Sequence, residues 1–144
     1  MTTVAVRPQV EAFVAALRAV PNLTVHVGVV PPAPVPPGGG PVAPVTPYVV
    51  VFPDGGLSDR EELVVVSDRL EQAVRVTCVG KTASEVLWAV ERVRGAVLDA
   101  RLTVAGRRAF PVSHESSSAL LRDDDVTPPL LYISDVYRLS TVAG

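Results

Sequence analysis

A proline- and glycine-rich stretch interrupts the chain and constrains how it can fold. Eight of the fourteen prolines lie between Pro31 and Pro47, with three consecutive glycines, 38–40, in the middle. The stretch could be a linker between domains, a docking motif, or one long loop inside a domain. The helix and strand predicted before it total about twenty residues, which are too few to bury a core alone. We therefore predict a single domain over residues 1–144, with an extended loop over residues 30–47.

The composition indicates a globular protein. Apolar residues make up 48% of the chain, charged residues make up 19%, and the formal net charge is −2. A near-neutral chain argues against an autonomous nucleic-acid binder, which usually has a basic face. The single cysteine excludes an intrachain disulfide and a cysteine-based metal cluster. Because there is no apolar run of about 18 residues and no signal peptide at the start, we expect no membrane span and synthesis in a cytoplasm.

The first predicted helix lies in PQVEAFVAALRAVP. Its apolar residues recur at helical spacing and form one stripe: Val10, Phe13, Val14, Leu17 and Val20. Pro8 suits the first helical turn, and Pro21 ends the helix. The alternation in LTVHVGVV then predicts a half-buried strand. A second strand, PYVVVF, follows the proline-rich stretch and ends at the turn signal PDGG.

A long strand leads directly into the second helix. In RLEQAVRVTCVG, apolar and polar residues take opposite faces, with Leu70, Val74, Val76 and Cys78 against Arg69, Glu71, Arg75 and Thr77. In TASEVLWAVERVRGAVLDA, Thr82 and Glu85 form a capping box, which satisfies backbone N–H groups of the first turn. The apolar stripe of this helix is carried by Val86, Val90, Val93 and Val97.

The remaining segments complete an α+β pattern. LSDREELVVVSD is either a short helix or a loop with a brief strand at residues 63–66. RLTVAGRRAFPV predicts a hairpin that turns near Ala105 and Gly106, SHESSSALLRDDDVTPP a polar loop, and LLYISDVYRLSTV a final strand. We therefore predict a mainly antiparallel β-sheet with two principal helices packed on one face, and the long proline-rich loop between the first two strands.

Several short patterns imitate chemical sites without completing them. The sequence Gly80-Lys81-Thr82 resembles the end of a phosphate-binding loop, but Arg75 stands where the first glycine is needed. His114 lacks the second histidine of a zinc-protease helix. The run of three aspartates at 123–125 lacks EF-hand spacing. No nucleophile, base and orienting group come together, so we expect no enzyme, no cofactor and no bound metal.

Two features point instead to contacts with a partner. On a helical wheel, the only tryptophan, Trp88, lies almost opposite the apolar stripe of its helix, and tryptophan is enriched at interfaces. A partner subunit or another part of the same chain could cover it. The proline-rich stretch is long for a loop in a compact domain. Its PPAPVPP segment contains Pro32, Pro34, Pro36 and Pro37 and includes the P-x-x-P spacing of polyproline II ligands.

The order of these segments resembles that of the tail terminator (tail completion) proteins of long-tailed bacteriophages, including minor tail proteins of actinobacterial phages. The resemblance rests on the helix VEAFVAALRAV, the PYVVVF strand with its PDGG turn, the strand-to-helix run EQAVRVTCVGKTASEVLWAVERVRGAVLD and the terminal LLYISDVYRLST strand. The resemblance covers most of the chain and depends on the order of the segments and their general residue character rather than on a catalytic motif.

The resemblance implies a structural virion protein, assembled in the host cytoplasm, at the junction of head and tail. Such proteins form a ring, expected to be a hexamer, that caps the head-proximal end of the tail tube and ends its polymerisation. The implied partners are further copies of the chain, the tail-tube protein and a head–neck connector protein. DNA would only pass through the lumen, and no catalytic residue is carried over.

Two questions stay open at this stage. The strand face that bears Arg69 and Arg75 either lines the lumen or is a solvated face, and we favour the solvated face. The chain could also be another head–tail connector or neck protein, or a binding module that docks through its proline-rich segment. In the ring interpretation, this segment is an arm that reaches toward an adjacent subunit or the tube.

Overall fold

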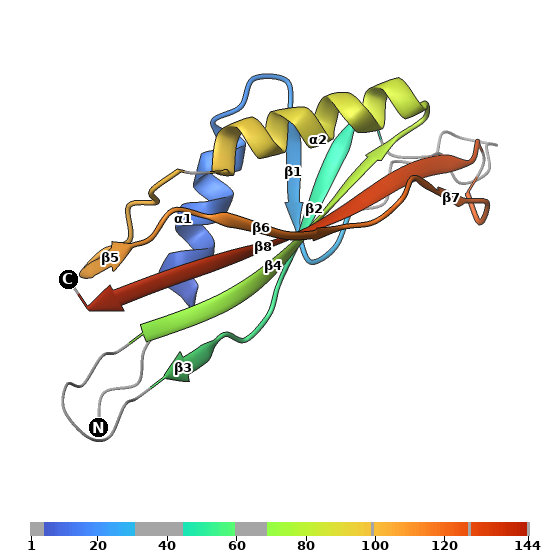
Figure 1. Ribbon diagram of the computed structural model, residues 1–144. Coiled ribbons are helices and arrows are strands. Elements are labelled where there is room, and N and C mark those ends of the chain that lie inside the picture. Colours follow the sequence, from blue (N-terminus) through green and yellow to red (C-terminus); the bar gives the residue numbers. More distant parts are fainter. Residues whose placement is uncertain (1–4, 31–44, 60–68, 99, 127, 144) are drawn as a thin grey trace.

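The computed structural model describes residues 5–30, 45–59, 69–98, 100–126 and 128–143 (Figure 1). Two helices and eight strands follow one another in the order α1 (Arg7–Arg18), β1 (Thr24–Val27), β2 (Tyr48–Pro53), β3 (Leu57–Asp59), β4 (Arg69–Gly80), α2 (Ala83–Val97), β5 (Arg107–Ala109), β6 (Ser113–Ser117), β7 (Leu121–Asp123) and β8 (Leu130–Ala143). The described helices include none that is long and apolar enough to cross a membrane.

The eight described strands form one twisted sheet, in which β1-β2-β4-β8-β5 is the main strand order and β3, β6 and β7 pair beside it with β4 or β8. The long strands β4 and β8 form its centre as an antiparallel pair, from Leu70 opposite Thr141 to Gly80 opposite Leu131. β2 and β3 pair with the outer edge of β4, while β5, β6 and β7 pair in turn with the outer edge of β8. Among the described strands, only β1 and β2 pair in parallel, so the predicted mainly antiparallel sheet is confirmed.

Both helices pack on one face of this sheet, as predicted (Figure 1). α2 lies across β4 and β8, and α1 packs beside α2 and against β1. Phe13 and Leu17 of α1 are fully buried, and the ring centroids of Phe13 and Tyr137 are 6.0 Å apart. The predicted stripe of α2 is buried in the same core: Val86, Val90, Val93 and Val97. The fold is therefore α+β, with its main core between the helices and the sheet.

The capping box at the start of α2 is confirmed. Thr82 Oγ1 accepts a hydrogen bond from the Glu85 backbone N–H at 3.2 Å, and a Glu85 carboxylate oxygen accepts one from the Lys81 N–H at 2.8 Å. Gly80 is needed here because a Cβ at this position would lie 2.7 Å from Glu85 Cβ. The glycine thus allows β4 and α2 to approach closely, which explains this part of the Gly-Lys-Thr pattern without a phosphate.

The polar loop predicted over SHESSSALLRDDDVTPP is wrong in part, since this segment contains β6 and β7. Both pair with β8, whose 14 residues offer an edge longer than β5 can fill. The side chains of β6 are all exposed, so the strand lacks the alternation by which a half-buried strand is recognised. The predicted turn is confirmed at Gly106, which has a positive φ of 72°. The strand after the turn, β5, pairs mainly with β8.

The strands that flank the proline-rich stretch are neighbours in the sheet. β1 ends at Val27; the next residue, Gly28, has a φ of 77°, and its N–H donates to the Val51 carbonyl at 2.8 Å. Since β1 and β2 run parallel, β1 ends and β2 begins at opposite ends of the pair. Most of the predicted loop, and the possible strand at residues 63–66, lie outside the described residues.

Candidate assembly surface

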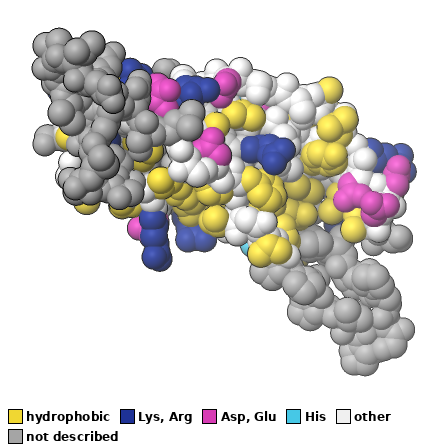
Figure 2. All heavy atoms as spheres, turned by 90° about the horizontal axis from the view of Figure 1, so that it is seen from below, with side chains coloured by type: hydrophobic (Ala, Val, Ile, Leu, Met, Phe, Trp, Pro, Cys, Tyr) yellow, Lys and Arg dark blue, Asp and Glu magenta, His cyan; other side chains and the backbone are white. Residues whose placement is uncertain are grey.

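The sheet face opposite the helices combines arginine side chains with apolar ones. Figure 2, which views the molecule from below Figure 1, shows hydrophobic and basic side chains mixed across its middle. Arg69 and Arg75 of β4 both lie on this face and both are exposed. The Arg75 guanidinium lies 5.5 Å from the ring centroid of Phe52, and that of Arg69 lies 5.6 Å from the ring centroid of Phe110. Such cation–π pairs hold the rings in place beside the charges.

The charges on this face are only partly balanced. Arg69 forms an ion pair with Glu71 at 3.0 Å and donates to Ser140 Oγ at 3.1 Å. Arg138 pairs with Glu115 at 2.8 Å and with Glu71 at 3.7 Å. Arg75 has no ion pair among the residues that the structure describes. The structure thus places Arg69 and Arg75 on one face of the sheet, as the sequence predicted, whereas a role of this face toward DNA stays a prediction.

A second, smaller hydrophobic cluster covers one end of the same face. It consists of Tyr48, Val50, Val79 and Leu130, all buried, with Val30, Val126 and Tyr132 packed against it. Burial raises the pKa of Tyr48, and the carboxylate of Asp123 at the nearby end of β7 adds to this rise. The sheet face opposite the helices is therefore not exposed to solvent throughout, because the residues of this cluster bury one another at one end of it.

Trp88 lies on the opposite side of the sheet from Arg69 and Arg75. It packs partly against the main core, and the Arg92 guanidinium lies 5.5 Å from its ring centroid. It also lines a hollow of about 390 Å³, together with Pro47 and four other residues. The chain itself therefore covers part of the ring, and contact with a partner subunit stays a prediction. Pro32, Pro34, Pro36 and Pro37 lie outside the described residues.

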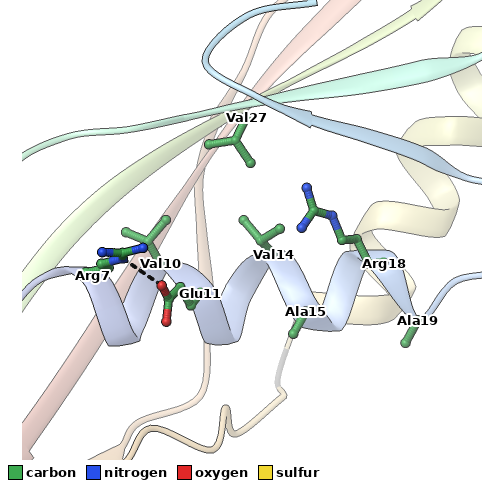
Figure 3. A pocket seen from close by; sticks show the side chains of 8 residues that line it. All are labelled: Arg7, Val10, Glu11, Val14, Ala15, Arg18, Ala19 and Val27. Carbon is green, nitrogen blue, oxygen red and sulfur yellow. Dashed lines mark hydrogen bonds and ion pairs between the residues drawn. The ribbon is translucent and has the colours of Figure 1, made fainter.

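A groove of about 740 Å³ runs along α1 beside the edge strand β1 (Figure 3). It is lined by Arg7, Val10, Glu11, Val14, Ala15, Arg18, Ala19 and Val27. β1 ends the sheet order, and its outer edge has no strand partner within the described ranges. The sequence predicted the apolar stripe of α1 but not this groove. The sequence feature that could have indicated the groove is the pair of small, exposed residues Ala15 and Ala19 beside the apolar stripe. Surface helices commonly carry such residues, so this feature alone does not predict a groove.

A buried carboxylate is a further feature that sequence reasoning missed. Asp135 lies on the core face of β8 with a relative exposure of 1%. Its Oδ2 accepts hydrogen bonds from Arg94 Nε at 2.9 Å and from the Tyr137 hydroxyl at 3.0 Å, and its Oδ1 accepts one from Arg94 Nη2 at 3.1 Å. His114 Nε2 lies 3.5 Å from Oδ1. The network joins α2, β6 and β8 across the core.

The electrostatics of this network suit a structural role. Burial alone would raise the pKa of Asp135, but hydrogen bonds from Arg94, Ser117 and Tyr137 hold it below its usual value. Burial, together with the charge of Asp135, raises the pKa of the Cys78 thiol to about 12. A thiol with so high a pKa is a poor nucleophile. Among the described residues, no group of three or more His, Cys, Asp or Glu side chains is placed to hold a metal ion.

These features define an α+β protein with one sheet face covered by two helices, a groove along α1 and several exposed apolar and charged side chains. Among solved structures, its fold is similar to a chain in the structure described as "Virion of native gene transfer agent (GTA) particle". The TM-score is 0.63 at 18% sequence identity, over 99% of this chain and 100% of that chain. At this identity the likeness establishes a shared fold. No family model and no curated protein matches the sequence.

Proposed function

We propose that this protein is a structural component of a phage-like virion. The observation that carries the proposal is the end-to-end likeness to a chain of a gene transfer agent virion, which covers 99% of this chain and all of that chain. A match over both full lengths concerns the whole domain, so it is not a likeness of one common motif. The order of the sequence segments, which resembles that of tail terminators, points independently to the same class.

Within that class, we assign the chain to a ring that caps the head-proximal end of the tail tube and joins tail to head. A ring is built from heterologous contacts, in which two unlike surfaces of one subunit meet the matching surfaces of its neighbours. The α1 groove and edge strand β1 supply one such surface, and the far end of the sheet around β7 supplies another. The assigned role is structural, and its location is the virion.

The test is assembly with and without the tail-tube protein. The purified chain is mixed with polymerised tail tubes, and the products are viewed by negative-stain electron microscopy and sized by light scattering. We expect a ring, sixfold in symmetry, at one end of each tube, and tubes that no longer grow. A chain that stays monomeric with tubes present, and that binds none of them, contradicts the proposal.

The same mixture separates a terminator from another connector or neck protein. A neck protein binds the head side of the junction and leaves free tube ends growing, whereas a terminator stops them. Deletion of residues 32–44 separates both from a module that docks through its proline-rich segment. A module loses its partner on deletion, whereas a ring subunit still folds and keeps the contacts made by its sheet and helices.

A further inference from the structure

The α1 groove, defined by the eight lining residues above, is apolar at its base and positive at one end. Val10 and Val14 point from α1 toward the side on which Val27 of β1 lies, and Val27 is 41% exposed (Figure 3). At the rim, Arg7 Nε is held by Glu11 Oε1 at 2.8 Å, so these two charges cancel. Arg18 also points toward this side and has no ion pair within the described part of the chain.

A surface of opposite character lies at the other end of the molecule. Residues 120–125, which we call the β7 tip, begin with two exposed leucines, Leu120 at 41% and Leu121 at 44%. Arg122 and three aspartates follow, and one guanidinium against three carboxylates leaves a net charge of −2. Arg122 pairs with Asp124, which leaves Asp125 as an exposed acid without an ion pair in the described ranges. Figure 2 shows an acidic cluster at the right-hand end, where β7 lies in Figure 1.

We propose that the α1 groove of one copy receives the β7 tip of a second copy of this chain. Leu120 and Leu121 enter the apolar base, and the aspartates face Arg18 at the rim. The argument for this occupant is complementarity: an apolar pair followed by excess negative charge meets an apolar groove whose rim arginine, Arg18, has no ion pair with another described residue. The inference deepens the proposed ring and rests on it.

The fold prevents one chain from making this contact with itself. β7 pairs with the start of β8, at Leu130 to Tyr132. α1 touches β8 farther along, where Phe13 packs on Tyr137 and Gln9 accepts a hydrogen bond from the Thr141 hydroxyl at 2.7 Å. These positions lie five and nine residues beyond Tyr132, roughly 16 to 30 Å at about 3.3 Å per residue. The contact is therefore heterologous and passes from copy to copy, as a closed ring requires.

The first test compares two exposed leucines. Leu121→Asp places a charge in the proposed contact, whereas Leu87→Asp changes a leucine that is 51% exposed on α2. Each full-length variant is mixed with tail tubes, and rings are counted by electron microscopy after circular dichroism has shown the fold. We expect Leu121→Asp to lose the rings and Leu87→Asp to keep them. Equal loss or equal retention in the two variants overturns the contact.

The second test reverses the rim charges. Arg18→Glu makes the rim of the groove negative, like the β7 tip. Because like charges then face each other, we expect subunit association to weaken by about fivefold or more. The double variant Arg18→Glu/Asp125→Arg restores the pairing and should return to within about twofold of the wild type. Arg108→Glu, at an exposed position of β5, is the matched control and should leave association unchanged. Sedimentation velocity over a dilution series measures all four proteins.

The outcomes separate this contact from the proposed function. A wild-type chain that forms no oligomer with tail tubes contradicts both. Wild-type rings that Leu121→Asp and Arg18→Glu leave intact contradict the contact alone, and the ring must then close through other surfaces. Loss of rings in both single variants, with recovery in the charge-exchanged double variant, supports it.

Discussion

The buried carboxylate of Asp135 makes the sharpest prediction for stability. Asp135→Asn keeps the shape of the side chain but removes the negative charge that Arg94 and Tyr137 both face. The amide also brings an N–H₂ donor toward groups that are themselves donors. We therefore expect the variant to fold, because packing is preserved, and to unfold at lower temperature and lower denaturant concentration than the wild type.

The size of the effect follows from the exposure of the two partners. Breaking a fully buried ion pair from one side costs about 3–5 kcal/mol, because the remaining charge stays buried. Here the Asp135 side chain is 1% exposed but that of Arg94 is 37% exposed, so water can solvate the remaining guanidinium. The expected loss is therefore smaller, about 2–3 kcal/mol. For a chain of this length, that lowers the Tm by about 4–12 °C.

The pH dependence of this loss carries a definite sign. The pKa of Asp135 is lowered in the folded state, so the unfolded chain takes up its proton first as the pH falls. The stabilisation is thus fully present above the unfolded value of about 3.9 and is lost as the pH falls through the folded pKa. The gap in stability between wild type and Asp135→Asn should be constant from about pH 8 to 5 and should narrow below about pH 4.

Urea unfolding followed by circular dichroism, at a series of pH values, measures this gap directly. Tyr137→Phe is the matched control, since it removes one neutral donor to the same carboxylate and should cost about 0.5–1.5 kcal/mol. The reasoning is refuted by an Asp135→Asn variant within about 0.5 kcal/mol of the wild type at pH 7. A gap that widens toward acid would contradict the sign of the pKa shift.

Three further outcomes can be measured on the same unfolding curves or by thiol labelling. Gly80→Ala should destabilise the protein by about 1–3 kcal/mol, because its Cβ would lie 2.7 Å from Glu85 Cβ. Gly95→Ala, in open space on α2, should instead stabilise the protein by about 0.5–1 kcal/mol. Similar effects of the two changes on stability would contradict this reasoning. Cys78, buried and with a thiol pKa raised to about 12, should react with a disulfide reagent at pH 8 only after unfolding; labelling of the folded chain would show an open core. Phe13→Ala should cost about 3–5 kcal/mol, and a loss under about 1 kcal/mol would mean that α1 is loosely packed.

The elements that bury an apolar stripe were the ones that could be predicted from the sequence. The apolar residues of α2 recur at helical spacing and those of β4 at every second position, and the predicted limits of β4 agree with those in the structure. What the pattern could not give was polar side chains within the core. Gln72 lies on the apolar face of β4 because Gln9 donates to its Oε1 at 3.2 Å and its own amide donates to the Asp54 carbonyl at 2.7 Å. A buried polar group is tolerated only where partners meet it, and those partners are distant in sequence.

The strands β6 and β7 were missed for a related reason. A strand at the edge of a sheet can be held by backbone hydrogen bonds to its neighbour, so its own residues need not alternate between apolar and polar. Ser113 to Ser117 form such a strand because β8 offers a long free edge, a property of a segment that comes later in the chain. The parallel pairing of β1 with β2 is equally hidden, because the two strands look the same whichever way they run.

The same limit applies to the candidate assembly surface, and it explains why the α1 groove emerged only from the structure. Ala15 and Ala19 look like ordinary surface residues until β1 is placed beside them with its outer edge unpaired. Leu121 likewise looks like one exposed leucine among several until β7 is placed at the opposite end of β8 from Gln9 of α1. An interface between copies is a relation between two distant surfaces, so its sequence signal is split between segments that carry no period of their own. The separation of the groove, between α1 and β1, from the tip at β7 is therefore what makes the proposed contact between two copies testable.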